Sequence, residues 1–135
     1  MNNQMGNLKA ALNLIEGTNM SPLLENELLQ LQNHLPELTF EYLDFMRSIG
    51  WGPIGHSRFM IYSGPIEPES IFDAAAAEEL AGILLIGDDF AGWSVGFDTR
   101  QNWKLIGIDS SDTKEIESLG VSLVDFQTRK FAPRT

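Results

Sequence analysis

A glycine-flanked serine is the residue whose surroundings most resemble a catalytic motif. Gly92-Trp93-Ser94-Val95-Gly96 has the form G-x-S-x-G, the nucleophile elbow in which a strained turn from a strand into a helix exposes the serine. The residues after Ser94 instead predict a continuing strand, and no histidine follows in the chain to act as the base. We therefore expect Ser94 to be a strand residue without a catalytic role.

A second motif match is the segment at residues 50–55, which reads GWGPIG and fits the dinucleotide-binding pattern G-x-G-x-x-G. That motif requires a strand before it and a helix after it, whose amino end receives the pyrophosphate. Here a predicted helix precedes the segment, and Pro53 lies inside the segment itself. The sequence favours the end of a helix followed by a loop.

The residues able to bind metal ions are few and poorly spaced. The chain has no cysteine, and its two histidines, His34 and His56, stand apart from any H-x-x-x-H or H-x-x-E arrangement. The pair Asp88-Asp89 offers carboxylate oxygens, but its spacing to the later aspartates matches no calcium loop. Those later aspartates are Asp98, Asp109 and Asp112. We expect no metal, no cofactor and no enzymatic activity.

Aromatic side chains beside acidic turns suggest recognition of another protein. Three tryptophans lie at predicted turns or strand starts, where a large ring serves either the core or a partner. Core packing is the ordinary role, but the centres of protein interfaces are rich in Trp and Tyr. The residues that we expect to contact a partner are Trp51, Asp88, Asp89, Trp93 and Asp98.

The net charge narrows the class of partner. Nineteen acidic residues against nine basic ones give a formal charge of −10. Such a surface repels phosphate backbones and anionic lipids, which argues against nucleic acid and membranes as partners. A basic protein would be attracted at long range. The alternative is that the acidic surface only keeps the protein soluble.

The first fifty residues predict three helices. Leu8, Leu12 and Ile15 have helical spacing, and Gly17 follows as a stop. In the second predicted helix Ser21 is the cap and Pro22 the first helical residue. An apolar stripe continues that helix until Pro36 ends it. The stripe consists of Leu24, Leu28, Leu31 and Leu35.

The third predicted helix begins after Thr39, which is its cap, and ends at Gly50 in a left-handed conformation. We expect one face of this helix to pack in the core. The residues of that face are Phe40, Leu43, Met46 and Ile49.

Short apolar runs separated by turn residues predict strands after Gly50. The expected strands are residues 58–62, 82–87, 93–98 and 103–108. The last three follow one another through short connections, which is typical of an antiparallel meander. Residues 68–80 predict a helical excursion, and Ser122 caps a final helix that reaches Lys130. The pattern predicts an α+β domain in which helices pack on a mainly antiparallel sheet of about four to six strands.

The chain length of 135 residues fits one domain. The composition is 43% hydrophobic and 21% charged, which is typical of a globular protein that folds without disulfides. The amino-terminal residues lack the basic and apolar segments of a secretory signal, and the longest apolar run is too short to span a bilayer. We expect a cytoplasmic protein.

Several short motifs resemble the SUKH superfamily, a group that includes a yeast regulator of cell-wall synthesis. The sequence LP at residues 35–36, YLDF at 42–45 and IG at 49–50 is similar to its opening pattern, with Ile-Gly in place of the commoner Asn-Gly. LLIGDD at 84–89, followed by a Gly-Trp pair, resembles its strand and acidic turn. Residues 122–126 resemble its closing helix. The resemblance covers about residues 23–131, and residues 1–20 form an additional helical extension.

The resemblance implies helices on an antiparallel-dominated sheet and, for many bacterial members, an immunity protein that neutralises a toxin, often a nuclease. Nuclease toxins tend to be basic, which agrees with the acidic charge. We expect binding by occlusion, with acids of residues 88–92 covering a cationic substrate surface. The alternatives are a regulatory or scaffold adaptor of the same fold and, third, a hydrolase that uses Ser94 or the aspartates.

Overall fold

The computed structural model describes residues 3–132. The helices are α1 (Gln4–Asn13), α2 (Glu25–His34), α3 (Phe40–Ser48), the 3-10 turn η1 (Pro68–Ser70), α4 (Ala74–Glu79) and α5 (Leu123–Phe131). The strands are β1 (Gly52–Ile54), β2 (Phe59–Ile66), β3 (Ile83–Asp88), β4 (Trp93–Asp98), β5 (Lys104–Asp109) and β6 (Ile116–Ser118). The predicted α+β fold is confirmed. Within residues 3–132, no helix combines the length and apolar character needed to cross a bilayer.

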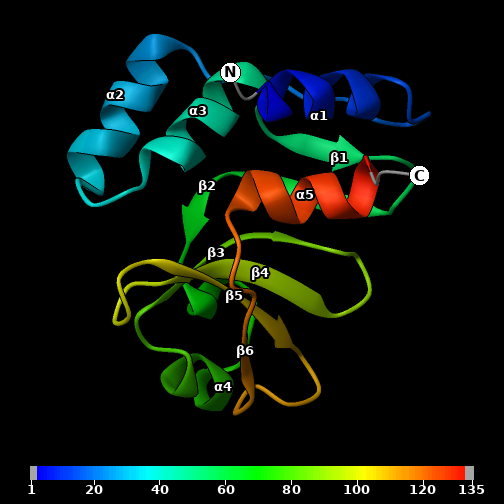
Figure 1. Ribbon diagram of the computed structural model, residues 1–135. Coiled ribbons are helices and arrows are strands. Elements are labelled where there is room, and N and C mark those ends of the chain that lie inside the picture. Colours follow the sequence, from blue (N-terminus) through cyan, green and yellow to red (C-terminus); the bar gives the residue numbers. More distant parts are fainter. Residues whose placement is uncertain (1–2, 133–135) are drawn as a thin grey trace.

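The six strands form one antiparallel sheet in the order β1-β2-β3-β4-β5-β6, so each strand pairs with its neighbour in the sequence (Figure 1). The predicted meander of β3, β4 and β5 is therefore confirmed, and the same antiparallel pattern also includes β1, β2 and β6. The outer side of β1 is covered, because Asn19 donates its N–H to the carbonyl of Pro53 and Ser21 forms a bridge with Trp51.

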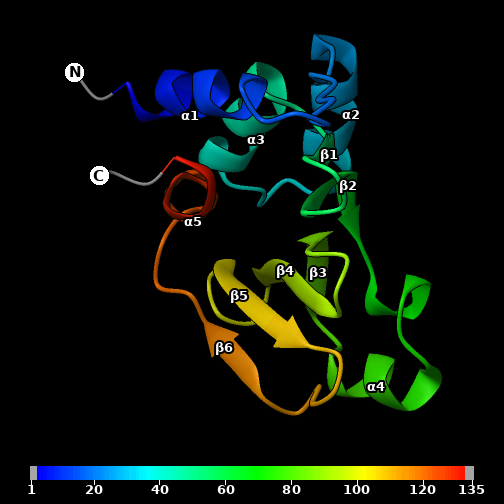
Figure 2. The same cartoon turned by 90° about the vertical axis from the view of Figure 1, so that its right-hand side faces the viewer.

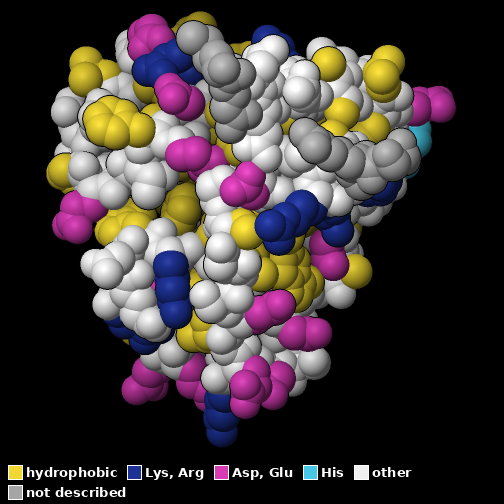
Figure 3. Space-filling model, in the orientation of Figure 1, with side chains coloured by type: hydrophobic (Ala, Val, Ile, Leu, Met, Phe, Trp, Pro, Cys, Tyr) yellow, Lys and Arg dark blue, Asp and Glu magenta, His cyan; other side chains and the backbone are white. Residues whose placement is uncertain are grey.

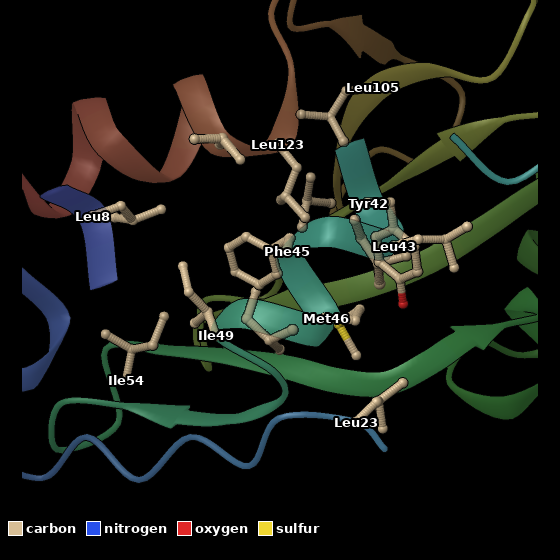
Figure 4. Close-up of a cluster of buried hydrophobic side chains, with 14 of the residues drawn as sticks. Leu8, Leu23, Tyr42, Leu43, Phe45, Met46, Ile49, Ile54, Leu105 and Leu123 are labelled. Atoms are coloured by element: carbon tan, nitrogen blue, oxygen red, sulfur yellow. The ribbon is translucent and has the colours of Figure 1, made fainter. Parts of the chain in front are cut away.

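Helices cover both faces of the sheet. On one face α1, α3 and α5 enclose the larger core, and the close-up in Figure 4 shows side chains from these helices meeting those of β1 and β5. On the other face η1 and α4 cover a smaller cluster, and Figure 2 shows α4 and α5 on opposite sides of the sheet. That cluster consists of Leu80, Ile83, Leu85, Ile106 and Ile108.

Polar side chains fix where the helices begin. Thr39 accepts the N–H of Tyr42 and Ser122 accepts the N–H of Asp125, so two of the three predicted caps are confirmed. Glu41 on α3 accepts the N–H of Val124 and thereby joins α3 to the start of α5. Burial raises the pKa of the Glu41 carboxyl above its ordinary value, although this hydrogen bond opposes the shift.

The structure overturns three of the sequence expectations for the helices. Ser21 does not cap α2, because its backbone is used in the bridge with Trp51, and α2 begins four residues later. Leu24, placed on the apolar stripe, is 65% exposed at the start of the helix. Phe40, expected in the core, is 79% exposed. The larger core therefore receives the other apolar residues of α3.

Two short edge strands were not predicted. Residues 52–54, expected to be loop, form β1, and the later strand β6 has only three residues. Leu28 of the predicted apolar stripe is buried, and so are Leu43, Met46 and Ile49 of the predicted core face of α3. Leu31 is only partly buried and packs against the core, so it is less buried than predicted.

Candidate functional site

The turn between β3 and β4 is held by its own two aspartates. Asp88 Oδ1 accepts the N–H of Phe90 at 2.8 Å. Asp89 Oδ1 accepts the N–H of Ala91 at 2.8 Å and that of Trp93 at 3.0 Å. Such Asx hydrogen bonds replace the backbone bonds that a tight turn lacks. Asp88 and Asp89 therefore fix the turn and place two negative charges there.

The same turn presents an exposed aromatic ring. Phe90 has a φ of +63° and is 51% exposed. A bulky residue with positive φ is uncommon and is tolerated only where its surroundings enforce it. The flanking hydrogen bonds of Asp88 and Asp89 supply that constraint. The hairpin therefore carries a solvent-facing phenyl ring in a fixed position, at the end of the sheet seen on the right in Figure 1.

Asp88 also ties the turn to the neighbouring strand. The Tyr62 hydroxyl on β2 donates to Asp88 Oδ2 at 2.5 Å, so both carboxylate oxygens of Asp88 accept hydrogen bonds within the protein. Burial, followed by the interaction with Asp88, raises the pKa of the Tyr62 phenol above its ordinary value. The phenol therefore remains a hydrogen-bond donor through the neutral pH range.

The tryptophans of the predicted site do not join Phe90 at the surface. Trp93 is half-buried, its ring lies 5.5 Å from that of Phe126 on α5, and it lies against Gly107, where a larger residue would collide with the indole. Trp51 lines a separate hollow of about 430 Å³ between α2 and the sheet edge. Trp93 thus helps to dock α5, and Trp51 lies in a different groove.

Asp98 differs most from expectation, because its side chain is fully buried. It lies at the far end of β4 from the Asp88 turn. Its carboxylate accepts hydrogen bonds from the backbone and guanidinium of Arg100 and from the Gln101 amide. Burial raises the pKa of Asp98, but these hydrogen bonds outweigh it and hold the pKa below its ordinary value. Asp98 is a structural residue of the β4–β5 turn, so its expected contact with a partner is wrong.

The structure also locates the residues considered for catalysis. Ser94 lies inside β4, is 5% exposed, and pairs with Asp88 on one side and Ile108 on the other. The strand continues beyond it, as predicted. Over residues 3–132 no group of three or more His, Cys, Asp or Glu side chains is placed to hold a metal ion.

Of the five residues predicted to contact a partner, only Asp88 and Asp89 lie together in an exposed turn. Sequence reasoning missed Phe90, although the Asp-Asp pair followed by Gly92 was a signal for an Asx turn with an exposed tip. Comparison of the chain with protein-family models, with curated proteins and with solved structures finds no match. The geometry of this turn therefore carries the functional argument.

Proposed function

We propose that this chain is a non-enzymatic immunity protein, which binds a basic toxin and occludes the toxin's cationic substrate surface. The observation that carries the proposal is Phe90, an aromatic ring half-exposed in a turn that two aspartates hold rigid. Aromatic anchors surrounded by polar groups are the usual centres of protein interfaces. The SUKH-like motifs support the same function.

The rigidity of the turn favours tight binding. Ordering a flexible side chain or loop on association costs about 0.5–1.5 kcal/mol per side chain. The turn from Asp88 to Gly92 is already ordered by its hydrogen bonds, so little of this cost remains. The phenyl ring is the apolar contact, and the carboxylates beside it favour Lys or Arg on the partner.

Long-range attraction supports a basic partner. The formal charge of −10 gives the protein an overall negative potential, and Figure 3 shows acidic side chains gathered over the lower part of the molecule around α4 and β6. Attraction of this kind raises association rates at low ionic strength. A nuclease, whose active site binds phosphate, presents the complementary charge.

Growth rescue tests the proposed function. The protein encoded beside this chain's gene is expressed alone, then together with wild-type chain, and then with the double variant Asp88→Asn/Asp89→Asn. We expect the neighbour to stop growth, the wild type to restore it, and the variant to restore it less. A matched variant, Glu115→Gln/Glu117→Gln, removes two exposed charges near β6 and should rescue fully.

Binding kinetics with the purified partner complete the test. The association rate should fall steeply with salt, and the dissociation rate should rise only in the Asp88→Asn/Asp89→Asn variant. A non-toxic neighbour that binds with little salt dependence would favour the adaptor function. Turnover that is lost on changing Ser94, with partner binding retained, would favour a hydrolase.

A further inference from the structure

The β4–β5 turn places Trp103 between two adjacent hollows. One hollow, of about 430 Å³, lies between the start of α3, the start of α5 and the sheet. The other, of about 470 Å³, lies between the end of α2, η1 and the start of β3. Trp103 lines both. Volumes of this size accept one or two side chains of a partner.

The backbone at Trp103 and at the residue before it has an unusual conformation. Asn102 and Trp103 have φ values of +57° and +56°. The Trp103 N–H donates to the carbonyl of Asp98, whose buried carboxylate in turn holds Arg100. The indole also packs on Phe97, with ring centres 5.9 Å apart. Asp98 therefore acts as a positioning residue for Trp103, and a Trp in this conformation points to a use for the exposed part of its ring.

The walls of the two hollows are apolar and their charged groups are mostly acidic. Leu105 and Leu123 contribute to the first hollow, and Leu35 and Ile83 contribute to the second. The ionisable residues along the two walls are Glu41, Asp125, Glu67, Glu69 and Lys104. Four carboxylates against one amine give the groove a negative charge that suits a cationic ligand.

An exposed aromatic residue, Phe40, lies next in the sequence to two lining residues of the first hollow. Phe40, which is 79% exposed, stands between Thr39 and Glu41, and both of these neighbours line the first hollow. Figure 3 shows hydrophobic side chains exposed on the left of the molecule, below the α2–α3 connection. The β4–β5 turn lies beneath that connection in Figure 1. Trp103 is the aromatic residue that lines both hollows.

We propose that this groove, lined by the two hollows and divided by Trp103, binds an extended segment of a partner protein that carries apolar side chains flanked by Lys or Arg. Alternate side chains of an extended chain lie about 6.6–6.8 Å apart on one side, so two of them enter the hollows on either side of the indole. The flanking basic side chains pair with Glu41 and Asp125 at one end and with Glu67 and Glu69 at the other. The groove lies at the opposite end of β4 from Phe90, and the inference does not depend on the proposed function.

Blocked pentapeptides are the probes for this groove. The peptide RLSLR has two leucines at alternate positions and an arginine at each end, ELSLE reverses the charges, and RSSSR lacks the apolar side chains. Titrations of isotope-labelled protein are followed by NMR. We expect saturable shifts for RLSLR alone, at the Trp103 indole and at the amides of residues 39–41 and 99–104.

Paired charge reversals locate the binding site. Glu67→Lys/Glu69→Lys changes two exposed residues whose side chains make no hydrogen bond within residues 3–132, so the fold should remain intact. We expect this variant to weaken RLSLR binding by about tenfold. Glu115→Lys/Glu117→Lys makes the same change of charge at β6 and should weaken binding by less than about twofold, through long-range attraction alone.

A ring deletion tests the role of Trp103. Trp103→Gly removes the indole while glycine accepts a φ of +56°. Provided that its amide spectrum stays dispersed, this variant should lose saturable binding of RLSLR, whereas Phe90→Ala should keep it.

Equal weakening by both lysine pairs, equal binding of ELSLE, or absence of saturable binding would each overturn the inference. Because no toxin is used, these outcomes are separate from the growth-rescue result.

Discussion

Replacing Phe90 by glycine and by alanine separates the two properties of the hairpin tip. Both substitutions remove the phenyl ring, so both should weaken binding of the partner to the same extent. Only glycine adopts a φ of +63° without steric cost, because it has no Cβ. The difference in stability between the two variants therefore measures the backbone strain at this position.

The expected magnitude follows from the conformation. A left-handed conformation costs an L-residue about 1–2 kcal/mol. Glycine gives back about 0.4–1 kcal/mol through the greater freedom of its unfolded chain. The free energy of unfolding of Phe90→Gly should therefore be about 0.8 kcal/mol higher than that of Phe90→Ala, so the glycine variant is the more stable of the two. Phe90 is 51% exposed in the wild type, so each variant loses about 100 Å² of buried apolar surface. This loss lowers the unfolding free energy by at most about 2.5 kcal/mol.

Urea unfolding at neutral pH supplies the measurement, with equal slopes required of both variants so that the free energies are comparable. Gly92→Ala is the reverse control. Gly92 has a φ of +96°, and a Cβ there would meet Ser110 Oγ at 2.8 Å, so this variant should be less stable than wild type. If Phe90→Ala equals or exceeds Phe90→Gly in stability, the left-handed conformation at Phe90 is wrong. If both variants bind the partner like wild type, Phe90 is not the anchor.

Three further predictions concern the interior. Gln127 is fully buried, and within residues 3–132 neither polar atom of its amide has a hydrogen-bond partner. Gln127→Met should therefore raise the unfolding free energy measured in thermal melts by about 1–3 kcal/mol, whereas Gln32→Met on the exposed face of α2 should change it by less than about 0.5 kcal/mol. Asp98→Asn should cost about 1–3 kcal/mol at pH 7. Because the folded-state pKa of Asp98 lies below its ordinary value of 3.8, the wild-type advantage should persist above that value and disappear as the pH falls through the folded-state pKa. Phe45→Ala should cost about 3–5 kcal/mol in urea unfolding, because the ring is fully buried.

Local sequence signals predicted the elements that have strong caps and long periodic runs. Thr39 and Ser122 begin helices as expected, because each hydroxyl accepts an N–H three residues later. The bounds of β4 agree with the expectation because alternating apolar residues lie between two turns. The edge strands β1 and β6 escaped prediction because three residues are too few to show a period of two.

Long-range contacts decided the rest, and these leave little trace in the sequence. Ser21 has the form of a helix cap, but its backbone pairs with Trp51 thirty residues away. The positive φ values of Phe90 and Trp103 were not predictable from residue type, since both are bulky. Asn102, which tolerates that conformation best, was the one available hint for the β4–β5 turn.

The aspartates contribute to the fold as well as to the charge. Asp73 accepts a backbone N–H at the start of α4, and Asp88, Asp89, Asp98 and Asp109 each accept the N–H two residues later in a turn. Part of the charge of −10 therefore has a local structural cause, and a loss of binding after removing an aspartate would not by itself show electrostatic recognition.

Asparagine separates the two roles within the turn, because its carbonyl oxygen still accepts the turn N–H groups while the negative charge is lost. At position 88 the amide NH2 replaces the oxygen that accepts the Tyr62 hydroxyl, so this hydroxyl has to accept a hydrogen bond from the amide instead of donating one. In Asp88→Asn/Asp89→Asn an unchanged melting temperature together with a slower association rate would assign the binding effect to charge. A lower melting temperature together with a slower association rate would assign the binding effect to the shape of the turn. The position of Phe90, rather than the acidity around it, would then be the determinant of recognition.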